Sequence, residues 1–305
     1  MQTVSILIVA VVPWALFGQQ QDYTISTQSN LVILDVGVKD AAGRLVEGLN
    51  EDNFRVFEDG RMQKISDFSR RDEPVTIGLV IDNSGSMRTK RLAVNAAAKG
   101  FIEASNPRDE IFITDFNDTV RRGPAGVPFT DDRSLLFRAL FRNPSEGRTA
   151  LYDAVVESLH HLESGRQTKK ALLVVSDGGD NASTHRREDV IRELHESLAT
   201  IYTVGIYDDD DPDRNPGLLR RLAETSGGEA FFPKELDDLE AICRKIAEDI
   251  RHRYTIAYIP PDSSVHRIRK IRVEATAPGH GKLTIHARTS YMFPADAATR
   301  EVSKK

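Results

Sequence analysis

Residues 75–86 have the sequence VTIGLVIDNSGS. A nearly continuous apolar run ends at Ile81 and is followed at once by Asp82, Ser84 and Ser86. Runs of this kind are typical of parallel strands that helices cover on both faces. The stretch therefore predicts a buried strand whose carboxyl end carries a loop rich in carboxylate and hydroxyl oxygens.

The same apolar pattern recurs further along the chain. Residues 171–175 have the sequence ALLVV and precede Ser176-Asp177-Gly178, and residues 201–206 have the sequence IYTVGI. Helical periodicity between these runs favours an α/β fold with a doubly wound, mostly parallel, Rossmann-like sheet. We expect strands at 75–81, 110–116, 119–122, 171–175, 200–206 and 230–232, and helices at 90–104, 187–197, 216–225 and 236–253, with two more starting near 133 and 149.

Five oxygen-bearing side chains are candidates for a metal site at one edge of this sheet. Ligands of open α/β sheets bind at the carboxyl ends of strands, where strand order reverses. Carboxylates and hydroxyls suit a hard divalent cation, so we expect Mg²⁺, with Mn²⁺ or Ca²⁺ as alternatives. Because only two of the five are charged, the cation would keep affinity for an outside carboxylate. The candidates are Asp82, Ser84, Ser86, Thr149 and Asp177.

Each candidate also has a purely structural explanation. Ser84, Ser86 and Thr149 could cap helices, because their hydroxyls accept from free backbone N–H groups. Asp177-Gly178 alone is a common turn. The joint occurrence of all five, with both acidic loops at strand ends, favours the metal site.

Together these residues resemble the metal-ion-dependent adhesion site of von Willebrand factor A domains. The resemblance rests on Asp82-x-Ser84-x-Ser86, on Thr149 within GRTALYDA and on Ser176-Asp177-Gly178, and it covers about residues 74–253. It implies that Thr149 and Asp177 bind the metal directly or through water. The flanks are similar to a bacterial secreted subfamily with a small β-region before the A domain, which implies no firm biochemical activity.

Three functions follow from this site. The leading hypothesis is an exported, metal-dependent adhesion module that captures an Asp or Glu of a protein partner through the cation. The alternatives are an envelope scaffold with a stabilising or vestigial metal site and, less favoured, a metal-dependent hydrolase. Asn83-Ser84-Gly85 lacks the leading glycine of a G-x-S-x-G elbow, and no base is evident near either loop. We therefore expect no enzyme and no catalytic residue.

The regions on either side of the α/β domain have β patterns. Residues 32–38 alternate, Asp59-Gly60 joins residues 54–58 to residues 62–65 like a hairpin, and three further β segments follow residue 253. Each set is too thin to be stable alone, so we expect one β-sandwich with the α/β domain inserted in it, with two separate β-appendages as the alternative. The expected divisions are 1–18, a signal peptide; 30–70, an N-terminal β-region; 74–253, the A domain; 254–293, C-terminal strands; and 294–305, a disordered tail.

The N-terminus predicts export. Residues 4–17 form an uncharged apolar stretch of signal-peptide length, shorter than the ~20 residues of a spanning helix. Because residues 1–3 carry no Lys or Arg, an uncleaved membrane anchor remains the alternative. We expect a secreted, periplasmic or envelope-associated protein.

Composition excludes several other classes. The net charge is −5 and basic residues are interspersed with acidic ones, so nucleic acid is not an expected partner. No histidine spacing supports a zinc hydrolase or a small-molecule cofactor, and His160-His161 is predicted to be an exposed pair. The single cysteine, Cys243, falls on the apolar face of a predicted helix, which favours inert packing over an intermolecular disulfide.

One acidic loop stands apart from the candidate site. Residues 208–215 have the sequence DDDDPDRN and follow the strand at 200–206. The loop lacks the glycine and distal glutamate of an EF-hand, so a solvated or partner-facing loop is favoured over a calcium site. If it lies at the same edge as the metal, it would repel acidic partners and narrow specificity.

Overall fold

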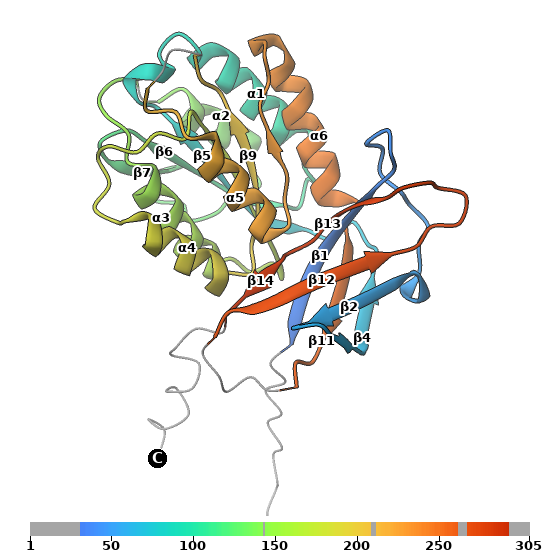
Figure 1. Ribbon diagram of the computed structural model, residues 1–305. Helices are drawn as coiled ribbons and strands as arrows, with labels where there is room; N and C mark the ends of the chain where they lie inside the picture. The colour runs from blue at the N-terminus through green and yellow to red at the C-terminus, as the bar shows by residue number, and fades with distance from the viewer. Residues whose placement is uncertain (1–30, 143, 209–211, 262–266, 293–305) are drawn as a thin grey trace, which may run out of the picture.

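The computed structural model describes residues 31–142, 144–208, 212–261 and 267–292 (Figure 1). It contains an α/β domain and a β-sandwich that takes strands from both ends of the chain. The predicted signal peptide and the predicted disordered tail lie outside the described residues. Among the described residues, no helix has the length and hydrophobicity that crossing a membrane requires.

The sheet of the α/β domain has six strands in the order β10-β9-β8-β5-β6-β7. Neighbouring strands are parallel except β7, which runs antiparallel to β6 at one edge. Strand order reverses at β5, which lies between β8 and β6, so the predicted doubly wound sheet is confirmed. The strands are β5 (Val75–Asp82), β6 (Glu110–Phe116), β7 (Val120–Gly123), β8 (Lys169–Ser176), β9 (Thr200–Gly205) and β10 (Ala230–Phe231).

Helices cover both faces of this sheet. Buried side chains of α1, α2 and α6 pack on one face, and those of α3, α4 and α5 pack on the other. Cys243 lies in the first of these cores, as predicted, and burial raises the pKa of its thiol to about 12. The helices are α1 (Arg91–Ala104), α2 (Arg133–Leu140), α3 (Leu151–Glu163), α4 (Arg187–Glu196), α5 (Pro216–Ser226) and α6 (Leu239–Arg251).

The sandwich consists of two antiparallel sheets with the orders β13-β1-β11-β4 and β14-β12-β2-β3. Strand β1 pairs with β11, and β2 pairs with β12, so each sheet combines strands from both ends of the chain. The inner faces share one apolar core, which confirms the predicted sandwich. The strands are β1 (Val32–Lys39), β2 (Phe54–Glu58), β3 (Arg61–Gln63), β4 (Ile65–Ser69), β11 (Tyr254–Tyr258), β12 (Arg269–Ala275), β13 (Thr284–His286) and β14 (Ser290–Tyr291).

One strand of the predicted hairpin needs correction. The hairpin joins β2 to β3 as expected, but the predicted strand at residues 62–65 divides at Lys64. After Lys64 the chain crosses to the other sheet, where β4 pairs with β11. An isolated hairpin would leave β11 with an open edge, and β4 covers it.

The sandwich contacts the end of the α/β sheet where β5 and β8 begin. Asp35 Oδ1 of β1 lies 3.9 Å from Lys169 Nζ at the start of β8. The Arg253 guanidinium donates to the carbonyls of Asp35, Gly227 and His286, which belong to three different segments. A strand of eight residues is about 25 Å long, so the carboxyl ends of the strands face away from the sandwich.

The predicted exposure of the histidine pair is only half correct. His160 is exposed and contacts Glu193. His161 is half-buried, because its ring stacks on Phe129 at 4.6 Å between centroids and meets the edge of Phe112.

Candidate metal centre

The loop after β5 is folded around the carboxylate of Asp82. Asn83 N donates to Phe116 O at 2.7 Å, so the loop stays attached to the end of β6. Ser84 N donates to Asp82 Oδ1 at 2.8 Å. A short 3₁₀ turn, Gly85–Met87, follows, and it brings Ser86 Oγ to 3.0 Å from Ser84 Oγ. Two hydroxyls and a carboxylate therefore meet within five residues.

The loop after β8 is bonded directly to the first loop. Ser86 Oγ donates to Asp177 Oδ2 at 2.6 Å, and Ser176 Oγ donates to Asp82 Oδ2 at 2.7 Å. Gly179 N donates to the other carboxylate oxygen, Asp177 Oδ1, at 2.9 Å. The two strands are neighbours in the sheet, which explains why residues far apart in the sequence meet here.

The segment before α3 brings Thr149 to the same place. Gly85 N donates to Gly147 O at 3.0 Å, which joins this segment to the first loop. Thr149 N donates to Asn181 Oδ1, and Thr149 O accepts from Asn181 N, both at 2.9 Å. All three loops are thus connected by backbone hydrogen bonds.

A cavity of about 140 Å³ opens between the three loops. Four of the five predicted ligands line it, and Asp82 lies beneath them with 1% of its surface exposed. Burial and the nearby Asp177 carboxylate raise the pKa of Asp82 to about 6. Two carboxylates held together in a buried place favour a cation beside them. The lining residues are Ser84, Ser86, Gly147, Arg148, Thr149, Asp177, Gly179, Asn181 and Asp213.

The oxygen atoms have a spacing that suits a small cation. Mg²⁺ binds oxygen octahedrally at 2.0–2.1 Å, which places adjacent ligands about 3 Å apart. Ser84 Oγ and Ser86 Oγ are 3.0 Å apart, and Ser86 Oγ lies 2.6 Å from Asp177 Oδ2. No group of three or more His, Cys, Asp or Glu suited to a metal occurs in the part of the chain that the structure describes. A cation here would therefore depend on the hydroxyls as well as the carboxylates.

Sequence reasoning missed the residue that organises the rim of the cavity. Asn181 Nδ2 donates to Asp213 Oδ2 at 3.2 Å, while Asn181 O accepts from an Arg148 Nη at 3.4 Å. The same side chain holds Thr149 through its Oδ1. In the sequence, Asn181 appears only in a chance-prone glycosylation triplet, so nothing in the pattern marks this role.

The acidic loop reaches the same edge of the sheet as the cavity. Asp208 pairs with the buried Lys90 at 3.0 Å, and Asp213 lines the cavity itself. Residues 209–211 lie outside the described residues. The loop therefore places the Asp213 carboxylate at the cavity, whereas Arg148, which pairs with Asp118 at 2.9 Å, places a guanidinium on its rim.

Comparison with known families agrees with this architecture. The family model of the von Willebrand factor type A domain matches residues 76–245. The chain belongs to this family. Among curated proteins, none matches the sequence of this A-domain protein.

Two solved structures are similar to this chain at low sequence identity. A von Willebrand factor type A protein from Catenulispora acidiphila is 15% identical, with a TM-score of 0.53, over 89% of this chain and 76% of that chain. A pilus adhesin, SpaC, from Lactobacillus rhamnosus GG is 12% identical, with a TM-score of 0.48, over 84% of this chain and 47% of that chain. At such identities the first likeness shows a shared fold alone.

Proposed function

We propose that this protein captures a partner protein by letting a partner carboxylate complete the coordination of a bound Mg²⁺. Five side chains would hold the ion, either directly or through water: Asp82, Ser84, Ser86, Thr149 and Asp177. The observation that carries the proposal is the cluster of hydroxyl and carboxylate oxygens about 3 Å apart at the mouth of a cavity.

The donor set favours an anionic partner. Three of the five donors are neutral hydroxyls, so the two carboxylates only just offset the charge of a divalent ion. The ion would supply a positively charged point at which a partner Asp or Glu binds. Mn²⁺ has similar demands, whereas Ca²⁺ takes 6–8 oxygens at 2.3–2.6 Å and would spread these side chains apart.

The hydrogen bonds between the loops favour binding over a scaffold role for the ion. Gly85 is already bonded to Gly147, and Thr149 is bonded to Asn181, without any metal contact. These hydrogen bonds contribute to holding the loops together, and they support a role for the ion toward an outside group.

The same geometry gives little support to a hydrolase. Neither histidine nor glutamate lines the cavity among the described residues. The Ser84 hydroxyl is 3.0 Å from another hydroxyl rather than from a general base. We therefore propose a non-enzymatic role.

We also propose that the protein is exported, on the basis of the apolar stretch at residues 4–17. Expression of the full chain followed by N-terminal sequencing of the exported product tests this. A mature terminus near residue 19 supports cleavage, and a product that keeps residues 4–17 supports an anchor.

The test of the proposed function is binding of a fluorescent peptide that contains one aspartate. Anisotropy should rise on addition of protein with Mg²⁺ and return to its starting value with a chelator. Ser86→Ala should weaken the interaction at least about tenfold, since even second-shell losses around metals have this size. Ser66→Ala, in the sandwich, is the matched control and should behave like the parent. Peptide binding that resists the chelator would contradict the proposal.

A further inference from the structure

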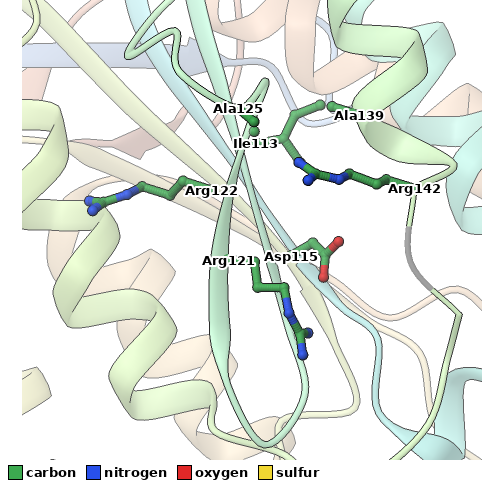
Figure 2. Close-up of a pocket in the computed structure, with 8 residues that line it drawn as sticks. Ile113, Asp115, Arg121, Arg122, Ala125, Ala139 and Arg142 are labelled. Carbon is green, nitrogen blue, oxygen red and sulfur yellow. The ribbon is translucent and has the colours of Figure 1, made fainter.

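A second cleft, of about 400 Å³, lies at the β7 edge of the α/β sheet. Its floor comes from β6, with Ile113 and Asp115, and its walls come from β7, the loop after β7, and α2. Figure 2 shows Arg142 reaching across the cleft toward the strands and Arg122 pointing to the opposite side of the β6–β7 ribbon. We call this feature the arginine cleft; it is lined by Ile113, Asp115, Arg121, Arg122, Gly123, Ala125, Ala139 and Arg142.

The arginine cleft offers positive charge in a protein whose net charge is negative. Asp115 is the only acidic residue among those lining it, and it is buried close to Arg91. Burial lowers the pKa of Arg91, and the Asp115 carboxylate acts in the opposite direction. The guanidinium groups of Arg121 and Arg142 belong to exposed residues. Arg121 donates to the neutral amide oxygen of Asn117 at 3.1 Å, and Asp115, which lies opposite it in the β6–β7 pair, is buried beside Arg91.

Hydrogen bonds through Asn117 connect the arginine cleft to the segment that carries Thr149. Asn117, which accepts from Arg121, also donates to Glu146 O at 3.1 Å, and Asn117 O accepts from Ala150 N at 2.8 Å. One segment runs from Arg142 at the cleft to Arg148 at the rim of the cavity. Six residues span at most about 20 Å, so both sites lie within reach of one short peptide.

We propose that the arginine cleft binds further acidic side chains of the same partner whose Asp or Glu occupies the metal centre. This inference rests on the proposed function and specifies its partner as an acidic segment rather than an isolated carboxylate. Guanidinium groups bind carboxylates through paired, charge-assisted hydrogen bonds, and Arg121 and Arg142 supply two such groups.

Charge also sets the direction in which the segment would run. Asp213 lines the metal cavity and continues into the acidic loop, which repels acidic residues of a partner. Arg148, which pairs with Asp118, lies on the rim of the cavity, and six residues before it Arg142 lines the arginine cleft. An acidic segment anchored at the metal would therefore extend toward Arg142 and away from Asp213.

The test compares two sets of synthetic peptides by anisotropy in Mg²⁺ with the full chain. One peptide has a single aspartate, and the others add a pair of glutamates at increasing spacing, up to six residues from the aspartate. At its best spacing the glutamate pair should strengthen binding about tenfold, the effect of one strong charge-assisted contact. High salt should reduce this gain, since charges at the surface are screened beyond about 8 Å at physiological ionic strength.

Paired variants assign the gain to the cleft. Arg121→Gln with Arg142→Gln should remove the tenfold advantage of the glutamate peptide and leave Mg²⁺ affinity unchanged. Arg142→Lys should keep part of it. The control, Arg55→Gln with Arg61→Gln, alters net charge equally on exposed residues of the sandwich and should keep the whole advantage.

The outcomes separate the two proposals. An advantage that survives loss of both cleft arginines, with metal-dependent binding intact, would overturn the cleft and leave the proposed function standing. An advantage that depends on the arginines but persists in chelator would support the cleft as an acidic-peptide site and contradict the metal-dependent function. Displacement of the peptide by a DNA oligonucleotide at equal charge concentration would overturn the assignment to an acidic protein segment.

Discussion

Replacement of Arg253 by methionine should uncouple the A domain from the sandwich. The Arg253 side chain is buried and follows α6. It donates to Tyr202 Oη at 2.6 Å, and that hydroxyl donates in turn to Asp249. Its other Nη donates to the carbonyls of three segments, including Asp35 O of β1 at 3.0 Å. One guanidinium thus connects β9 and α6 of the A domain to both ends of the chain.

The expected loss of stability follows from these partners. Removal of one member of a buried ion pair costs about 3–5 kcal/mol, because the remaining charge stays buried without its partner. Methionine fills a similar volume, so the cavity contribution is small. Lys39 lies 3.3 Å from Asp249 and compensates part of the lost charge. We expect Arg253→Met to lower the free energy of unfolding by about 3–5 kcal/mol.

Urea denaturation, followed by far-UV circular dichroism and by tyrosine fluorescence, measures this change in the free energy of unfolding. The parent should unfold in one transition, and the variant should show two, as the domains lose their coupling. Arg55→Met, at an exposed position of β2, is the control and should shift stability by no more than about 0.5 kcal/mol. A loss below about 1 kcal/mol in Arg253→Met, with a single transition, would refute the reasoning.

Three further predictions concern the site, the metal and pH. Gly178 has φ +86°, and a Cβ there would lie 2.6 Å from Asn215 O. Gly178→Ala should therefore shift the Asp177 loop and weaken the affinity for Mg²⁺ that calorimetry measures. The control is Gly43→Ala, at φ +74° in open space, which should leave the affinity for Mg²⁺ unchanged. Saturating Mg²⁺ should stabilise the protein by about 2.7 kcal/mol at a hundred times Kd, and chelation should reverse this in thermal unfolding while the far-UV spectrum at 25 °C stays the same. Burial, and to a lesser extent Arg288, lower the pKa of His195 in the folded state. The unfolded chain therefore binds the proton first, and the free energy of unfolding falls as pH drops below about 6.5. Denaturation at a series of pH values should show a smaller fall in His195→Gln, and an equal fall would contradict the assignment.

The sequence predicted the fold well where burial decides the pattern. The strand β5 is apolar on both faces because helices cover both, and its apolar run marks it without ambiguity. The shared sandwich was predicted because the strands before the A domain and the strands after it are each too few to form a stable sheet alone. The crossing at Lys64 was missed, because β3 and β4 form one extended segment in the sequence and only the open edge of β11 separates them.

The candidate site was predictable only in part, for a related reason. Asp82 and Asp177 each follow a buried strand directly, so the topology of the sheet brings them together. Asn181, Arg121 and Arg142 lie in loops or on an edge strand, and tertiary structure alone decides what they contact. Arg253 shows the same limit, since a charged residue after an amphipathic helix is expected at the surface and is found buried.

The central claim is that the three loops hold a divalent cation through two carboxylates and three hydroxyls. Calorimetric titration of metal-stripped protein with Mg²⁺ and Mn²⁺, beside a variant with both Asp82→Ala and Ser84→Ala, tests it most directly. The account predicts saturable binding at one site in the parent, which the double variant loses while its far-UV spectrum is unchanged. Absence of binding in the parent, or equal binding in the variant, would contradict it.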